Sequence, residues 1–129
     1  MTEQLISFET AKLAKEAGFD WQIVTAYVDL TPLELFTEEV TEFVYQANHN
    51  NKPHRISAPT QSLLAKWLRD VHNIHVKISC HLGDWYFELV SILGHFNTNR
   101  YSEVEYITYE AALEEGLKEG LRGLLSRGN

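Results

Sequence analysis

The residues that decide the fold are APTQSLLAKWLRDVHNIHVKISCHLGDWYFELVSI, numbered 58–92. Pro59 disfavours helical geometry at the residue before it, and the Thr60 hydroxyl can accept an amide hydrogen of a first helical turn. The apolar residues that follow recur at steps of one, three and four, as on one stripe of an amphipathic helix: Leu63, Leu64, Trp67, Leu68 and Val71. Asn73 tolerates the left-handed conformation that ends many helices. We therefore predict a helix over 60–72.

A β-hairpin is predicted directly after this helix, near 75–92. Apolar and polar residues alternate from His75 to Leu82, and this period of two is typical of a strand with one buried face. Gly83-Asp84 fits a two-residue turn whose first position has a positive φ. The turn fixes the register, and the predicted pairs on the buried face are Leu82 with Trp85, Cys80 with Phe87, and Ile78 with Leu89.

The second face of the hairpin carries a mixture of polar, aromatic and apolar residues. Its predicted pairs are His81 with Tyr86, Ser79 with Glu88, Lys77 with Val90, and His75 with Ile92. Aromatic and apolar residues on a face that should meet solvent indicate a contact surface. The candidate contact residues are His75, His81, Tyr86, Val90 and Ile92. The alternative is that the N-terminal part of the chain covers this face.

The first third of the chain predicts a short helix and two strands. Ser7 is a good N-cap for a helix at about 8–17, and Gly18 is a typical stop after it. β-Branched and aromatic residues favour a strand over 22–28. A second strand is predicted over 42–47, although Leu33, Phe36, Val40, Phe43 and Val44 also fit a helical stripe.

The remaining segments lead to a second long helix. Residues 48–57 are rich in asparagine and are predicted to form a loop, as are the polar residues 94–100. Alternation over 101–107 favours a third strand or an extended edge. Thr108 can cap a helix over about 108–125, whose apolar stripe is Leu113, Leu117, Leu121 and Leu124. Gly116 and Gly120 in this helix predict tight packing on the sheet.

Together these elements predict an α+β fold in a single domain over 1–129. The expected architecture is a small, mainly antiparallel sheet, formed by the hairpin near 75–92 and further strands. Two main amphipathic helices, at about 60–72 and 108–125, should pack on one face of this sheet. The short helix at about 8–17 is auxiliary.

Composition excludes several classes of protein. The 129 residues have a net charge of −7, which disfavours broad electrostatic binding to nucleic acid. A hydrophobic fraction of 44% argues against wholesale disorder. One cysteine cannot form an internal disulfide, which fits a reducing compartment. Because no apolar run approaches the roughly 20 residues of a membrane helix, we expect a soluble, cytoplasmic protein with no membrane partner.

The residues that could carry chemistry favour packing over catalysis. Cys80 and His81 are strand neighbours, so their side chains point to opposite faces, and His75 lies roughly 20 Å from His81. Together with His72 they are too dispersed for one metal ion. Cys80 is predicted to be buried opposite Phe87, where a thiol is inert. With no phosphate-binding loop, nucleophile elbow or HExxH motif, we expect no catalytic residue, cofactor or metal.

Two stretches resemble a known group of proteins. APTQSLLAKWLRDVHNIHV at 58–76 and YEAALEEGLKEGLRGLL at 109–125 are similar to an APTQ…WLRxxHxI…YEEALExGL pattern. The pattern belongs to small uncharacterised α+β proteins of gut bacteria, their phages and mobile elements. That group has no known activity, so the resemblance implies a setting and assigns no functional residue.

A weaker similarity concerns the order of hairpin, edge strand and closing helix. It resembles HicB-type antitoxins, whose pattern is a partial double-stranded-RNA-binding fold, and it implies a nucleic-acid-associated regulator. The acidic charge, the lack of catalytic motifs and the second face of the hairpin favour a different function. We predict a non-enzymatic accessory protein of phage or mobile-element type that binds another protein or forms a homodimer. The nucleic-acid-associated regulator is the alternative.

Overall fold

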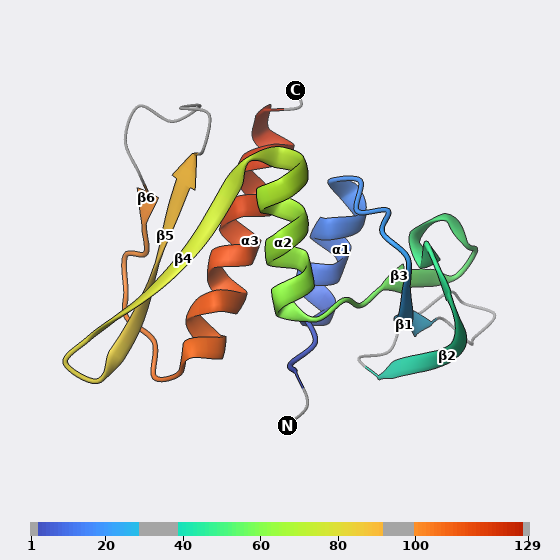
Figure 1. Ribbon diagram of the computed structural model, residues 1–129, viewed down its shortest axis with the longest axis horizontal. Helices are drawn as coiled ribbons and strands as arrows, with labels where there is room; N and C mark the ends of the chain where they lie inside the picture. The colour runs from blue at the N-terminus through green and yellow to red at the C-terminus, as the bar shows by residue number, and fades with distance from the viewer. Residues whose placement is uncertain (1–2, 29–38, 92–99, 128–129) are drawn as a thin grey trace. The chain divides into compact units, whose positions relative to one another are not determined.

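The structure, a computed structural model, has the small α+β fold that the sequence predicts (Figure 1). The residues that it describes are 3–28, 39–91 and 100–127. Within these ranges there are three α-helices and two antiparallel sheets of three strands each.

The chain divides into two compact units. The N-terminal unit is Leu5–Thr60, and the C-terminal unit is Gln61–Asn129 together with Met1–Gln4. Each unit has its own sheet, and each is described by itself. The assignment of 1–129 to a single domain stays a prediction.

The N-terminal unit combines one helix with a sheet of strand order β2-β1-β3. Its elements are α1 (Phe8–Glu16), β1 (Ile23–Val28), β2 (Val40–Ala47), the 3-10 turn η1 (His49–Asn51) and β3 (Arg55–Ser57). The strands predicted over 22–28 and 42–47 are confirmed to within two residues. The helical alternative is wrong for the residues of β2, while Leu33 and Phe36 lie outside the described residues.

Both predicted ends of α1 are confirmed. The Ser7 hydroxyl oxygen accepts a hydrogen bond from the Thr10 amide at 3.2 Å, which satisfies one donor of the first turn. At the other end Gly18 has a φ of 94°, and the amide of Phe19 donates to the carbonyl of Ala14 at 2.9 Å. This is the hydrogen-bond pattern of a Schellman motif, which favours glycine at the left-handed position.

The prediction of a loop throughout 48–57 is wrong, because this segment contains β3. Strand β3 pairs antiparallel with β1, and Ile56 and Ser57 are buried. The Asn50 side chain holds the segment in place, donating to the Phe19 carbonyl and accepting from the Ser57 amide, both at 2.8 Å. The Asn50 side chain thus makes hydrogen bonds that backbone groups would otherwise make, and these bonds hold a polar segment in one conformation.

The C-terminal unit packs two helices against a sheet of strand order β4-β5-β6. Its elements are α2 (Gln61–His72), β4 (Ile74–His81), β5 (Asp84–Ser91), β6 (Arg100–Tyr101) and α3 (Tyr109–Arg127). Figure 1 shows α2 and α3 on the same side of this sheet. The buried residues between them are Leu64, Trp67, Leu68, Ile74, Val76, Phe87, Leu89, Leu113, Leu117 and Leu121.

The caps predicted at Asn73 and Thr108 are observed, while the cap at Thr60 stays a prediction. Asn73 follows α2 with a φ of 59°, and the Thr108 hydroxyl accepts from the Ala111 amide at 3.0 Å. Val71, in the last turn of α2, is 48% exposed, so the stripe ends one turn earlier than predicted. Among the described residues, no helix combines the length and apolar character needed to cross a membrane.

The close packing predicted for Gly116 and Gly120 is confirmed. A Cβ atom built at Gly116 would lie 2.6 Å from Val76 Cγ1 and 3.1 Å from Phe87 Cβ. At Gly120 the nearest side-chain atom, on Leu68, would be 3.4 Å away. The backbone of α3 therefore approaches the sheet most closely at Gly116.

The turn of the hairpin lies one residue earlier than predicted. Leu82 and Gly83 form it, with φ values of 52° and 92°, and positive φ at both positions is typical of a type I′ turn. The observed pairs on the buried face are Cys80 with Trp85, Ile78 with Phe87, and Val76 with Leu89. The register differs from the predicted one by two residues, so the residues that stay within the strands keep their faces although their partners change. Leu82 is the exception: it was predicted to pair with Trp85 on the buried face, but it lies in the turn and is 92% exposed.

The third strand is shorter than the prediction for 101–107. β6 ends at Tyr101, and the chain returns to β5 only at Tyr106, whose amide and carbonyl both bond to Trp85, at 2.7 and 2.8 Å. Ser102 still bonds to Phe87, so two extra residues are inserted before Tyr106. This insertion makes a bulge next to α3. Most of the turn predicted at 94–100 lies outside the described residues.

Candidate functional site

The face of the β4-β5-β6 sheet that points away from α2 and α3 is here called the open face. Strand alternation assigns its residues, because Val76, Phe87 and Leu89 point toward the helices. The described residues of the open face are His75, Lys77, Ser79, His81, Asp84, Tyr86, Glu88, Val90 and Tyr101. It therefore contains four of the five candidate contact residues, and the fifth, Ile92, lies outside the described residues.

The candidate contact residues do not form one cluster. His75 pairs across the strands with Val90, whereas His81 pairs with Asp84 at the turn. Tyr86 lies between these ends and is partly exposed. Its ring centre is 6.5 Å from that of Tyr101, a β6 residue that the sequence analysis did not select. The structure thus places a pair of tyrosines on the open face, with Tyr86 on the central strand β5 and Tyr101 on the edge strand β6.

A carboxylate is buried beside these tyrosines. Glu88 is only 8% exposed, and the Lys77 ammonium lies 4.0 Å from its carboxylate. The negative charge of Glu88, together with a hydrogen bond between the two side chains, raises the pKa of Tyr101. Tyr101 therefore remains a neutral hydrogen-bond donor over a wide pH range.

Cys80 is exposed, so the prediction that it is buried opposite Phe87 is wrong. It lies near the hairpin turn and pairs with Trp85, beyond the part of the strand that the glycines of α3 contact. Its neighbour His81 instead pairs with Glu105, with 3.0 Å between Nδ1 and Oε1. Within the described part of the chain, no three His, Cys, Asp or Glu side chains are arranged to hold a metal ion.

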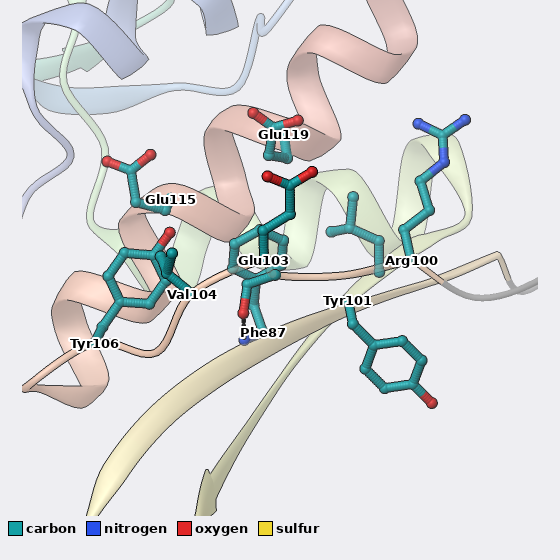
Figure 2. Close-up of a pocket in the computed structure, with 10 residues that line it drawn as sticks. Phe87, Arg100, Tyr101, Glu103, Val104, Tyr106, Glu115 and Glu119 are labelled. Carbon is teal, nitrogen blue, oxygen red and sulfur yellow. Dashed lines mark hydrogen bonds between the residues drawn. The ribbon is translucent and has the colours of Figure 1, made fainter.

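A groove runs along the other side of the same sheet, between α3 and the bulge that follows β6. Its volume is about 600 Å³, and Phe87 and Leu89 form its apolar floor. Glu115 and Glu119 line it from α3 (Figure 2). We call this cavity the α3 groove.

The opposite wall of the α3 groove comes from the bulge. It supplies Glu103, Val104 and Tyr106, and Arg100 lies at one end. Figure 2 shows Arg100 and Glu103 extending toward α3, whereas Tyr101 points away from the groove. Because β6 ends early and two extra residues follow it, the wall stands apart from α3 and leaves the groove open.

The α3 groove combines aromatic surface with negative charge. The Tyr106 ring stacks on Phe87, with 6.4 Å between centroids and 23° between planes. Burial raises the pKa of Tyr106, and the charges of Glu115 and Glu119 raise it further. The phenol is therefore neutral, and the groove suits a positively charged ligand better than an anion.

Sequence patterns did not indicate a second cluster, which lies in the N-terminal unit. The Arg55 guanidinium carbon is 4.1 Å from the centre of the Phe43 ring, and its Nη1 donates to Tyr45 Oη at 2.8 Å. The same nitrogen is 3.1 Å from Nδ1 of His49, which is buried and stacked on Phe43. Burial lowers the pKa of His49, so the neutral ring accepts from Arg55. These residues meet only through the pairing of β1 with β2 and β3.

Comparison with known proteins gives no relative for this chain. No family model matches it, and neither a curated protein nor a solved structure is detectably similar. Inferences about function therefore rest on the residues and geometry described above.

Proposed function

We propose that the protein is a non-enzymatic accessory protein that binds another protein through the open face. The observation that carries this proposal is the partly exposed Tyr86–Tyr101 pair on a sheet face opposite both helices of its unit. Tyrosine combines a large apolar ring with a polar hydroxyl, and it is enriched in protein interfaces. His75 and Val90 extend the same surface along the strands.

The electrostatics of the open face support a specific contact. Glu88 is largely desolvated before any partner binds, so the cost of removing it from water has mostly been met during folding. A partner needs to desolvate chiefly the tyrosine rings and the exposed Lys77 and His81 side chains. Interfaces of this kind derive most of their affinity from a few aromatic residues at the centre.

Affinity capture with matched tyrosine variants tests the proposal. Tagged wild-type protein should retain a defined partner from lysate of a bacterial host, and Tyr86→Ser combined with Tyr101→Ser should reduce its recovery roughly tenfold, because two central aromatic residues are lost. Tyr109→Ser is the control, since Tyr109 is also partly exposed but lies at the start of α3. Equal recovery by all three proteins, with each shown by circular dichroism to be folded, would count against the open face.

A homodimer is one form that the protein partner can take. Light scattering after size-exclusion chromatography separates this case from a foreign partner, because a dimer formed by the open face should dissociate in the double tyrosine variant. A strictly monomeric protein that captures nothing would overturn the proposed function.

The alternative function, a nucleic-acid-associated regulator, has weaker support from charge. The first half of α3 carries Glu110, Glu114 and Glu115, which repel phosphates. Such a regulator should shift DNA or RNA in a gel at low salt, with binding that weakens steeply as salt is added. A shift of this kind would replace the protein-binding proposal.

The setting is also a proposal. The APTQ…WLRxxHxI…YEEALExGL resemblance supports a phage or mobile-element origin, and the single cysteine supports a cytoplasmic location. Genes for phage structural or transfer functions next to this gene would support the origin, and a neighbourhood of housekeeping genes would contradict it.

A further inference from the structure

The α3 groove is a cavity separate from the open face, with a lining of its own. It lies on the helix side of the sheet, with a volume of about 600 Å³ and an apolar floor of Phe87 and Leu89. Pockets of this volume are large enough to take several side chains or a small molecule. The groove is therefore a second concave surface, separate from the tyrosine pair.

The lining of the α3 groove is acidic, because it contains Glu103, Glu115 and Glu119 but only one cation, Arg100. Glu115 is bonded to Lys118 at 3.1 Å and Glu119 to Arg122 at 2.6 Å, both through Oε1, so a basic ligand would share these two carboxylates with cations that lie outside the groove lining. Among the described residues the structure records no partner for Oε2 of either glutamate, nor for the Glu103 carboxylate across the groove.

The spacing of the glutamates indicates what kind of ligand fits. Glu115 and Glu119 are one helical turn apart, which separates them by about 6 Å along α3. In an extended peptide, side chains on the same side of the backbone recur about every 6.7 Å. Basic residues at alternate positions of a strand-like segment can therefore each reach one glutamate, while the residue between them points away from α3.

We propose that the α3 groove binds an extended segment of a partner protein that carries lysine or arginine at two alternate positions. This inference rests on the proposed function in that the ligand belongs to a protein partner, and it adds a second contact with its own chemistry.

Fluorescence anisotropy with labelled synthetic peptides on the full chain tests the proposal. The peptide GKVKVG has lysines at alternate positions, GKKVVG has them adjacent, and GQVQVG has none. Wild-type protein should bind GKVKVG most tightly, and the affinity should fall as salt is added. Glu115→Gln with Glu119→Gln should weaken GKVKVG binding by roughly three- to tenfold, since exposed ion pairs contribute a few-fold each.

Glu110→Gln is the matched control, because it makes the same charge change on α3 outside the α3 groove and should leave binding unchanged. Binding that is equal in wild type and the Glu115/Glu119 double variant would overturn the proposal, as would no binding at millimolar peptide. Spermidine that binds as tightly as GKVKVG, with the same loss in the double variant, would also overturn it in favour of a free polyamine site. A failure of the tyrosine variants leaves these outcomes unchanged, so the two proposals are tested separately.

Discussion

Alanine at Gly116 should destabilise the C-terminal unit, whereas alanine at Gly120, four residues later on α3, should stabilise it. A Cβ atom at Gly116 would lie 2.6 Å from Val76 Cγ1 and 3.1 Å from Phe87 Cβ, and both side chains are buried. At Gly120 the nearest atom is Leu68 Cδ1 at 3.4 Å, an ordinary van der Waals distance. The same substitution therefore meets two different environments on one helix.

The two effects of the substitution can be compared in magnitude. Replacing glycine by alanine inside a helix contributes about 1 kcal/mol of stability at either position. Overpacking a closely packed core costs about 1–3 kcal/mol, and this cost applies at Gly116. We expect Gly116→Ala to lose up to about 2 kcal/mol in net free energy of unfolding and Gly120→Ala to gain up to about 1 kcal/mol.

Urea unfolding followed by tryptophan fluorescence measures this difference. A Trp21→Phe background restricts the signal to Trp67 and Trp85, which both lie in the C-terminal unit. Val76→Ala removes the atom that would clash with the new Cβ. It should therefore reduce the free energy of unfolding less in the Gly116→Ala variant than in the parent. The reasoning is refuted if both glycine variants have urea midpoints at or above that of the parent. It is also refuted if the losses of stability caused by Val76→Ala and Gly116→Ala simply add in the double variant.

Three further outcomes are expected. Because burial lowers the pKa of His49, the folded N-terminal unit binds fewer protons than the unfolded chain below about pH 6.5, so its free energy of unfolding should fall as the pH drops through that value. His49→Gln should flatten this dependence in urea titrations, and an unchanged slope would contradict it. Leu82 is 92% exposed with a positive φ, so Leu82→Asn should add up to about 1 kcal/mol of stability in calorimetry; a loss would contradict the turn assignment. Glu88→Gln should lower the pKa of Tyr101 in an ultraviolet titration, and no change would disprove the coupling.

The ends of the helices could be predicted because they depend on local chemistry. The hydroxyls of Ser7 and Thr108 accept from amides three residues later, and this spacing is visible in the sequence. Gly18 and Asn73 tolerate positive φ, which marks where a helix stops. In each case the residues that interact are close neighbours in the chain.

The hairpin register could be predicted only in part. Two turns around Gly83 fit this sequence. Gly83-Asp84 would place glycine first, as in a type II′ turn, whereas Leu82-Gly83 places it second, as in a type I′ turn. The burial pattern did not decide between them, because a shift of two residues leaves every side chain on the same face. Alternation also gave the correct face for Cys80 but not its exposure, which depends on how far the helices extend along the strand.

The candidate sites depend on contacts that are distant in sequence. Tyr101 joins Tyr86 through the pairing of β6 with β5, and residues 92–99 separate these strands in the chain. The α3 groove depends on two extra residues before Tyr106, and nothing in the local pattern marks them as a bulge. The open face could therefore be predicted from the sequence, but neither the tyrosine pair on it nor the α3 groove could be.

The hold on β3 depends on the Asn50 side chain being a neutral amide. Its nitrogen donates to the Phe19 carbonyl, while its oxygen accepts from the Ser57 amide. Spontaneous deamidation would keep the acceptor but replace the donor by an anionic oxygen that faces the Phe19 carbonyl, so attraction would become repulsion. Deamidated molecules would then hold β3 less firmly than intact ones, although the two forms differ at a single residue.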